Sequence, residues 1–286
     1  LALDGRQLGA ALLDLGDKPR DGAQLLDQPA GALQALHVAG VLPVEHDPAG
    51  QEGVQELEDF GRIAVADRKH AATNPKAYFY GAPITMEDHQ QSRWIVEPVL
   101  RLLDCCQESD GGVALVVTTP ERARDLRQPP ALVVAAAQGA ADDGELMTSY
   151  YRPEITGLPE MGVVASKLWS ASGLTPGDIQ TAFLYDHFTP FTLIQLEELG
   201  FCGKGEAKDF IADGAIEIGG RLPINTHGGQ LGEAYIHGMN GIAEGVRQLR
   251  GTSTAQVKDA TVSMVISGPM VTPVSSMILG SQETVR

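Results

Sequence analysis

Four short motifs in the second half of the chain hold the residues best suited to proton transfer. They are Tyr185-Asp-His-Phe188, Asn225-Thr-His-Gly-Gly229, Glu233-Ala-Tyr-Ile-His237 and Ser267-Gly-Pro269. Each motif lies just past an expected strand, where α/β folds gather their ligands. Tyrosine and histidine side chains both act as general acids and bases. The motifs together predict an acid–base site, although a structural role for any single histidine stays open.

The most informative segment runs from Arg221 to Arg250 and contains two of these motifs. It joins a short apolar entry to Gly228, Gly229 and Gly232, which carry no Cβ and let the backbone approach a ligand closely. We therefore expect an active-site turn in which backbone amides near Gly228 support the reaction.

Other chemistries fit these residues less well. His227, Glu233 and His237 have the spacing His-x5-Glu-x3-His, which matches no established zinc signature, so no metal is expected. A hydrolase triad built on Ser267 lacks the Gly-x-Ser-x-Gly elbow. The Gly-x4-Gly-Lys-Ser/Thr phosphate loop is also missing from the sequence.

The composition argues against several classes of partner. The net charge of −16, from 21 basic and 37 acidic residues, disfavours nucleic acid, because phosphate binding requires clustered Lys and Arg. We expect no membrane partner, because no apolar run approaches the roughly 20 residues of a membrane helix. The three cysteines (Cys105, Cys106 and Cys202) are too few for a disulfide scaffold, which favours a reducing cytoplasm.

Alternating strand and helix patterns predict an α/β layered fold that positions the motifs. Strands are expected over 113–118, 131–137, 179–185, 259–266 and 274–279. Helices are expected over 60–72, from a cap at Thr85 through 92–103, and over 162–173, 190–199 and 241–249.

A change in amino-acid composition after residue 59 and a proline-rich linker near residue 129 divide the chain into three parts. Residues 1–59 contain 11 acids against 3 bases and no aromatic residue, so they can bury little apolar area. We expect them to be either non-native sequence, from a GC-rich gene read in another frame, or a disordered acidic extension. Residues 60–128 form the second part, and Gln128-Pro-Pro130 leads into the third, 129–286.

From about Phe60 to its end the chain resembles the thiolase superfamily, specifically its nonspecific lipid-transfer (sterol-carrier thiolase-like) branch. It looks most like the thiolase-like aldolases of bacterial steroid side-chain degradation. Tyr185-Asp-His-Phe188 matches the family motif Asn-Glu-Ala-Phe, and Ser267-Gly-Pro269 falls on Cys-x-Gly. The stretch 228–236 falls on Gly-Gly-x4-Gly-His-Pro, and 105–115 resembles the end of the family's N-terminal half.

The resemblance implies a thiolase-like layered α/β/α fold. Its C-terminal domain, residues 129–286, is expected to be complete. Its N-terminal half is expected to be partial, with residues 60–128 as the remnant.

Departures from the family pattern point to the reaction. Tyr185 stands where the family has its oxyanion-hole Asn, Tyr235 where it has the catalytic His, and Ser267 where it has the proton-relay Cys. A Claisen enzyme also carries its acyl group on a nucleophilic Cys, and residues 1–59 contain none. These departures favour retro-aldol cleavage of a β-hydroxyacyl-CoA, from a steroid or lipid side chain, which needs no covalent carrier.

The residues then take named roles. We expect Tyr185 and Tyr235 to be the acid–base pair, with His227 as the third catalytic residue. A phenol titrates near 10, so the base needs a pKa lowered by a neighbour such as His227 or His237. The expected supporting residues are His187, His237, Gly228, Gly229 and Ser267.

Two other functions stay open at this point. One is an acyltransferase (an acetyl-CoA acetyltransferase or thiolase) whose nucleophile half is missing. The other is a non-catalytic lipid-binding or scaffold subunit, in which the tyrosines only line an apolar pocket. The resemblance implies coenzyme A as part of the substrate with no permanently bound cofactor. It also implies a small OB-fold partner protein and a homodimer.

Overall fold

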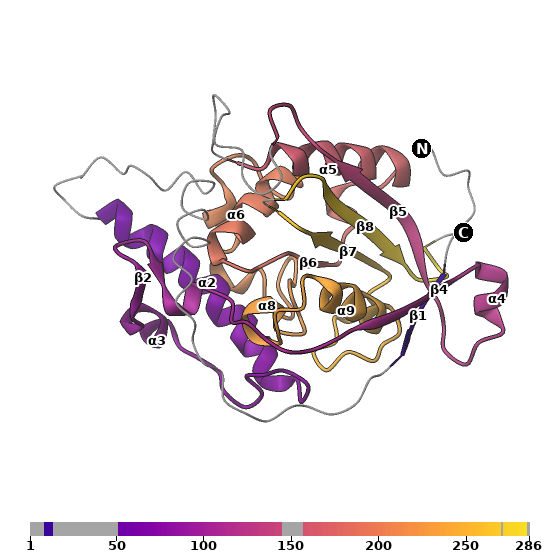
Figure 1. The fold of residues 1–286 in the computed structure, drawn as a ribbon, viewed down its shortest axis with the longest axis horizontal. Helices are drawn as coiled ribbons and strands as arrows, with labels where there is room; N and C mark the ends of the chain where they lie inside the picture. The colour runs from indigo at the N-terminus through magenta and orange to yellow at the C-terminus, as the bar shows by residue number, and fades with distance from the viewer. Residues whose placement is uncertain (1–8, 14–50, 145–156, 270, 285–286) are drawn as a thin grey trace.

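The computed structural model describes residues 9–13, 51–144, 157–269 and 271–284 (Figure 1). Within these residues the centre is a six-stranded sheet in the order β4-β1-β5-β8-β7-β6, and β2 pairs with β3 in a separate hairpin. The strands are β1 Gly9–Leu13, β2 Trp94–Val96, β3 Leu100–Arg101, β4 Ala114–Thr118, β5 Ala131–Gly139, β6 Thr181–Phe183, β7 Val262–Ser267 and β8 Val274–Gly280. The α-helices are α2 Gln51–Thr73, α3 Met86–Gln91, α4 Pro120–Arg124, α5 Pro159–Ser172, α6 Thr189–Glu198, α7 Ala207–Phe210, α8 Gly229–Gly232 and α9 Met239–Leu249. Short 3-10 turns cover Leu102–Asp104, Pro176–Asp178 and Ala212–Gly214.

Helices cover both faces of the sheet, with α5 on one side and α9 on the other (Figure 1). The alternation of side chains along β7 shows this directly. Met264 and Ile266 join the larger hydrophobic cluster with α5, whereas Val265 between them joins Val246 of α9 in a second cluster. Successive side chains of a strand point to opposite faces, so the sheet is the middle layer. The predicted α/β/α layering is confirmed.

Most of the predicted elements of the C-terminal domain are present. The strands expected at 131–137, 259–266 and 274–279 are confirmed as β5, β7 and β8. The helices expected at 162–173, 190–199 and 241–249 are confirmed as α5, α6 and α9, with small shifts at their ends. Apolar runs predicted these strands, whereas the glycine that follows 190–199 and the apolar face of 241–249 predicted helices.

The helix predicted to run through 92–103 is wrong. Thr85 does cap α3 through a capping box with Asp88, but the helix ends at Gln91. The chain then forms the β2–β3 hairpin. Ile95 and Val96 are β-branched, and Pro98 has no N–H to donate within a helix, so this sequence favours an extended hairpin.

The long helix α2 packs directly on the glycine turn of the predicted site. The helix predicted over 60–72 lies within α2, which ends at Thr73 before Asn74-Pro75. A Cβ built on Gly228 would lie 2.5 Å from the Cβ of Ala71 on α2, and one built on Gly232 would lie 2.7 Å from it. Glycine at both positions therefore allows α2 and α8 to touch.

The prediction for residues 1–59 falls mainly on 1–8 and 14–50, which lie outside the described residues. Of the described parts, β1 pairs with both β4 and β5. The helix α2 continues across residue 59 without interruption. None of the described helices combines the length and the apolar composition that crossing a bilayer requires.

The contact between α2 and α8 makes Gly228 a sensitive position. Gly228 has φ +110, and its added Cβ would clash with the Cβ and Cα of Ala71. We expect Gly228→Ala to lower the free energy of unfolding by about 2–5 kcal/mol, from overpacking plus the left-handed backbone. Gly81→Ala is the matched control, because Gly81 has φ +72 and nothing within 4 Å of an added Cβ. It should lose only about 1–2 kcal/mol in urea unfolding, and equal losses would contradict this packing.

Candidate active site

Tyr185 and Tyr235 meet through their hydroxyl groups. The Tyr185 hydroxyl donates to the Tyr235 hydroxyl at 3.2 Å and lies 3.4 Å from Nδ1 of His237. The two tyrosine rings stand nearly perpendicular, with centroids 6.2 Å apart. Tyr185 is buried, Tyr235 is half-buried and His237 is exposed. The group thus extends from the end of β6 to the surface.

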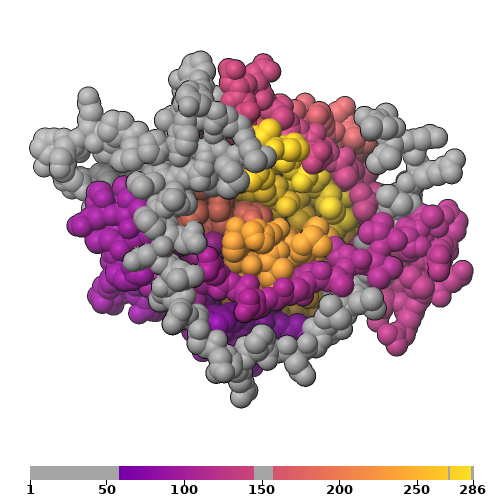
Figure 2. Space-filling model, viewed as in Figure 1, coloured from indigo at the N-terminus to yellow at the C-terminus, as the bar shows by residue number. Residues whose placement is uncertain are grey.

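The exposed end of this group lies on an accessible face. Figure 2 shows that the orange segment around α9 reaches the surface between the yellow C-terminal strands and a magenta stretch of the chain. Met239, which begins α9, is 37% exposed, and His237 just before it is also exposed. Solvent or a ligand can therefore reach the outer side of the tyrosine pair.

The stretch between β3 and β4 joins the segments that carry the two tyrosines. Cys105 pairs with Phe188 in an antiparallel bridge, and Glu108 pairs with Tyr235 in a parallel bridge. The Tyr235 N–H donates to Oγ of Ser109 at 3.3 Å. Residues of the predicted second part of the chain therefore align loops of the third.

Two of the predicted supporting residues lie beside Tyr185. The His187 ring packs edge-on against the Tyr185 ring, with centroids 5.0 Å apart, and stacks on Phe191. A Cβ built on Gly238 would lie 3.2 Å from the Tyr185 ring and 3.3 Å from Oγ of Ser267. An added side chain would be crowded there and strained by the left-handed backbone of Gly238 (φ +79), and Ser267 at the end of β7 belongs to the same group of residues.

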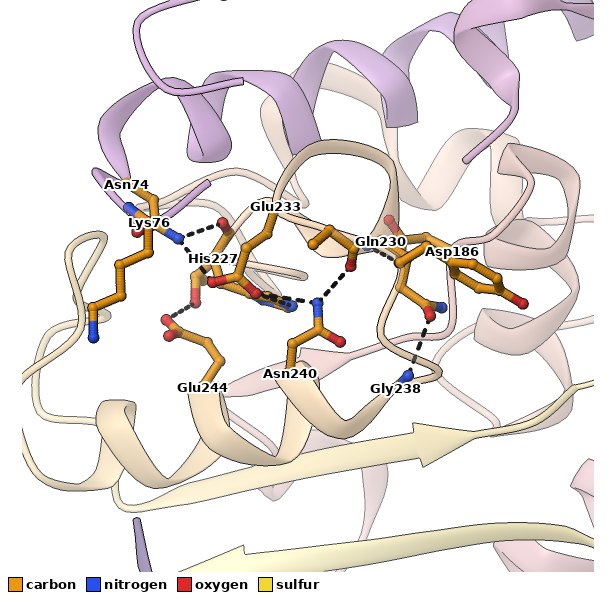
Figure 3. A network of polar contacts seen from close by, with 12 residues as sticks. Asn74, Lys76, Asp186, His227, Gln230, Glu233, Gly238, Asn240 and Glu244 are labelled. Atoms are coloured by element: carbon orange, nitrogen blue, oxygen red, sulfur yellow. Dashed lines mark hydrogen bonds and ion pairs between the residues drawn. The ribbon is translucent and has the colours of Figure 1, made fainter. Parts of the chain in front are cut away.

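His227 occupies a different, buried network. Its Nε2 lies 3.8 Å from Oε2 of Glu233, and its carbonyl accepts from Nδ2 of Asn74 at 3.0 Å. Asn74 and Asn240 also donate to the Glu233 carboxylate, as Figure 3 shows. Burial lowers the pKa of His227 to about 4. No contact joins His227 to either tyrosine in the part of the chain that the structure describes, so its catalytic role stays a prediction.

Three backbone N–H groups of the glycine turn donate hydrogen bonds to acceptors within the protein. The Gly228 N–H donates to the carbonyl of Asn225 at 2.7 Å. The N–H groups of Gln230 and Leu231 donate to the two carboxylate oxygens of Asp186 at 2.9 and 3.1 Å. These three amides are therefore not open to a ligand, contrary to the expectation for the turn around Gly228.

Glycine at position 229 leaves room for the Asp186 carboxylate, because a Cβ there would lie 2.0 Å from Oδ2 of Asp186. Sequence reasoning assigned no role to Asp186. The available signal was an acidic residue at a strand end ahead of a glycine-rich helix start, since carboxylates cap helix N-termini.

A second carboxyl group lies against the first. Asp67 on α2 is fully buried beside Asp186, and a hydrogen bond from the Asn225 side chain only partly offsets the loss of solvent. Burial and the neighbouring charge of Asp186 raise the pKa of Asp67 well above its usual range. Burial also raises the pKa of Asp186, to about 6, although the amide hydrogen bonds oppose this. Two carboxyls in contact are stable when they share a proton, so Asp67 is the neutral partner.

Both tyrosines are neutral phenols in the free protein. Burial raises the pKa of Tyr185 above its usual range, and the hydrogen bond to Tyr235 raises it further. Burial also raises the pKa of Tyr235, although the hydrogen bond from Tyr185 opposes the shift. The expectation that a histidine lowers a tyrosine pKa here is therefore wrong in direction, because loss of solvent dominates.

The nearby thiols are also protonated. Burial raises the pKa of Cys106 to about 12, and burial with the charge of Asp104 raises that of Cys105 further. A thiol acts as a nucleophile through its thiolate, so neither cysteine is activated in the free protein. Among the described residues, no group of three or more His, Cys, Asp or Glu is placed to share a metal ion.

Comparison with known proteins gives consistent matches. Residues 139–281 match the family model described as thiolase C-terminal domain-like. The chain is 74% identical over 222 residues to the 17-hydroxy-3-oxo-4-pregnene-20-carboxyl-CoA lyase of Mycobacterium tuberculosis. It is 70% identical over 224 residues to the steroid side-chain-cleaving aldolase of Thermomonospora curvata. Each alignment covers 78% of this chain and 57% of the relative, so the chain spans less than two thirds of these curated relatives.

One solved structure resembles almost the whole chain. It is titled Ltp2-ChsH2(DUF35) aldolase and superposes with a TM-score of 0.81 at 56% sequence identity. The match covers 98% of this chain and 74% of that one.

The carboxyl pair gives the protein a pH-dependent stability that one substitution should remove. Raised acid pKa values mean that the folded chain binds more protons than the unfolded chain, so stability is lost as the pH rises above about 4. Asp67→Asn removes this proton requirement and offers an N–H donor to Asp186. We expect its free energy of unfolding to exceed that of the wild type by about 1–3 kcal/mol at pH 8, and the gain to vanish near pH 4.

Asp104→Asn is the control for this measurement by urea unfolding. Asp104 is equally buried, but it receives hydrogen bonds from Thr189 and the Arg101 amide and contacts His89. Its replacement should lower stability at pH 8. A loss of stability in Asp67→Asn at pH 8 would show that Asp67 is ionised and has donors.

Proposed function

This chain belongs to the thiolase superfamily, as its motifs predicted, and we propose that it is a lyase that cleaves a β-hydroxyacyl-CoA by a retro-aldol reaction. The observation that carries the proposal is the 3.2 Å contact between the hydroxyls of buried Tyr185 and half-buried Tyr235, next to the exposed His237. The names of its relatives in M. tuberculosis and T. curvata favour a steroid side chain as the substrate.

The reaction needs two proton movements and no external reagent. A base takes the proton of the β-hydroxyl, the Cβ–O bond becomes a carbonyl, and the Cα–Cβ bond breaks. The electron pair of that bond passes to Cα and the thioester as an enolate, which is then protonated at Cα. Hydrogen-bond donors that favour the enolate lower the barrier. A pair of phenols can supply both the acceptor and the donor.

The hydrogen bonds suggest which phenol does which. Tyr235 accepts from Tyr185, and this bond favours ionisation of Tyr235 relative to Tyr185. We therefore assign the base to Tyr235 and the donor to Tyr185. His237 is the supporting histidine in this scheme, because its Nδ1 is near the Tyr185 hydroxyl and its ring is exposed. A proton can pass from the pair through this imidazole to solvent.

The raised tyrosine pKa values affect when the β-hydroxyl proton moves relative to cleavage of the Cα–Cβ bond. A free phenolate is disfavoured in the buried pair, so Tyr235 passes its own hydroxyl proton to Tyr185 as it takes the proton of the β-hydroxyl, and Tyr185 passes its proton to the enolate as the Cα–Cβ bond breaks. The same burial argues against acyl transfer through a described cysteine. A carrier thiol needs a low pKa, and that of Cys106 is raised to about 12.

Further parts of the proposal concern the substrate and the partners. Coenzyme A enters as part of the substrate, with no permanently bound cofactor. The similar structure pairs its aldolase with a DUF35 protein, which supports a small OB-fold partner for this chain. A homodimer remains part of the proposal from family resemblance. The three free cysteines are consistent with a protein that acts in the reducing cytoplasm.

Tyr185→Phe and Tyr235→Phe test the proposal. Each removes one hydroxyl and keeps the ring, so each should lower kcat at least about 100-fold while the protein stays folded. The assay follows conversion of 17-hydroxy-3-oxo-4-pregnene-20-carboxyl-CoA to a ketone and a shortened acyl-CoA by mass spectrometry, with a DUF35 partner present. Tyr80→Phe is the control, because Tyr80 is 54% exposed, and it should leave kcat unchanged.

The same assay separates the alternatives. Cleavage that does not need free coenzyme A supports the lyase, whereas transfer that depends on free coenzyme A indicates an acyltransferase. Binding without turnover would indicate a lipid-binding or scaffold subunit. Full activity in either tyrosine variant would remove the pair from the mechanism.

A further inference from the structure

We propose that two buried glutamines, Gln195 and Gln230, are positioning residues that hold the tyrosine pair together. Neither glutamine belongs to the acid–base group itself. Gln195 binds the backbone of Tyr185, and Gln230 binds the backbone of Gly238, near Tyr235. The inference rests on the proposed lyase function, because it assigns these side chains a role in the rate of that reaction.

Gln195 holds the backbone of Tyr185 on both sides. It lies on α6, is fully buried, and its Oε1 accepts the Tyr185 N–H at 2.9 Å. Its Nε2 donates to the carbonyls of Tyr185 and Phe191, both at 2.9 Å. Tyr185 lies beyond Phe183, the last residue of β6, so the β6–β7 ladder does not hold it. The side-chain amide of Gln195 takes the place of a neighbouring strand.

Gln230 holds the other half of the site. It lies in α8, is 4% exposed, and its Oε1 accepts the Gly238 N–H at 3.1 Å, as Figure 3 shows. The bond fixes the orientation of this amide, since an N–H donor can pair only with the oxygen. A Cβ built on Gly238 would lie 3.2 Å from the Tyr185 ring, so the backbone at Gly238 runs close to that ring, and Gly238 follows Tyr235 and His237 in the chain. Gln230 therefore sets the position of the 235–238 turn against Tyr185.

The two glutamines are linked through Asp186. The backbone N–H of Gln230 donates to the Asp186 carboxylate, and Asp186 follows Tyr185, whose peptide Gln195 holds. The connections form a closed ring from Tyr185 through Asp186, Gln230 and Gly238 back to the Tyr185 side chain. A ring of this kind resists separation of the two hydroxyls. This matters because a displacement of about 1 Å between reacting groups can cost roughly 100-fold in rate.

Gln230→Met is the principal test, because methionine has a similar length but accepts no comparable hydrogen bond. We expect kcat for the steroid acyl-CoA to fall about 10- to 100-fold with KM within about twofold, since Gln230 is buried and the substrate does not meet it. Gln230→Glu keeps an oxygen for the Gly238 N–H and should recover part of kcat. Equal kcat in Gln230→Met and wild type would overturn the proposal.

Gln248→Met is the matched control. Gln248 is 1% exposed on α9, and its amide donates to Thr226 and to the carbonyl of Ala255. Its loss should lower the melting temperature without lowering kcat at a temperature where the variant is folded. A fall in kcat equal to that of Gln230→Met would show that any buried glutamine has this effect, which contradicts a positioning role.

Gln195→Met leaves the buried Tyr185 N–H without an acceptor and leaves the Tyr185 carbonyl only the His187 ring, so we expect this variant to be poorly folded. Gln195→Glu keeps the acceptor for the Tyr185 N–H. The glutamate variant should fold and lose kcat with KM little changed. Wild-type kcat in folded Gln195→Glu would overturn the role of Gln195.

A readout without turnover separates this inference from the proposed function. In protein labelled with 3-fluorotyrosine, the ¹⁹F resonances of Tyr185 and Tyr235 can be assigned by their Tyr→Phe variants. Gln230→Met should shift or broaden both resonances, and Gln248→Met should leave them in place. A wild type that cleaves nothing would end the proposed function alone. Unchanged resonances in Gln230→Met would end the inference.

Discussion

The buried carboxylate of Asp186 is the interaction on which the geometry of the site depends. A charge removed from water costs several kcal/mol unless hydrogen bonds replace its hydration, and the amides of Gln230 and Leu231 supply two of them. Because Asp186 directly follows Tyr185, this requirement fixes where α8 begins relative to the first tyrosine. The need for glycine at 229 is a consequence, since the carboxylate occupies the space that a side chain would take.

Several buried polar side chains of the turn next to that carboxylate lack hydrogen-bond partners. In the described residues, Nδ1 of His227, Oδ1 of Asn240 and Nε2 of Gln230 are buried without a hydrogen-bond partner. Each such group costs about 1–3 kcal/mol, whereas β7 and β8 pair along their whole lengths beside them. Unfavourable local chemistry that persists in a stable fold is expected where geometry serves function. We therefore interpret the conformation of this turn as a consequence of the need to place Tyr235 and His237 beside Tyr185.

The sequence was sufficient for most elements of the C-terminal domain and for the tyrosine pair, and insufficient for the groups that hold the pair. Strands β5, β7 and β8 follow from apolar runs, and the two tyrosines follow from motifs at expected strand ends. Sequence spacing could not separate His227 from His237, because only the folded turn sends one into the interior and the other to the surface. Gln195 and Gln230 bind backbone groups, which leave no motif, whereas Asp186 is marked only by an acidic residue at a strand end ahead of a glycine-rich helix start. The helix expected through 92–103 is wrong because Pro98 and the β-branched Ile95 and Val96 favour the β2–β3 hairpin.

Two phenols and a hydroxyl give the site different abilities from the amide, imidazole and thiol that the family pattern has at these positions. A phenol both donates and accepts, and Tyr185 is placed to do so with Tyr235 and His237. Burial keeps both phenols of the pair protonated and uncharged, so the free protein holds no standing nucleophile there. Such a pair suits a reaction whose own bond cleavage generates the charge, because the enolate can accept a hydrogen bond as it forms. It does not suit a reaction that must first attack a thioester and keep the acyl group. The same burial that makes these tyrosines poor free bases therefore favours lysis over transfer.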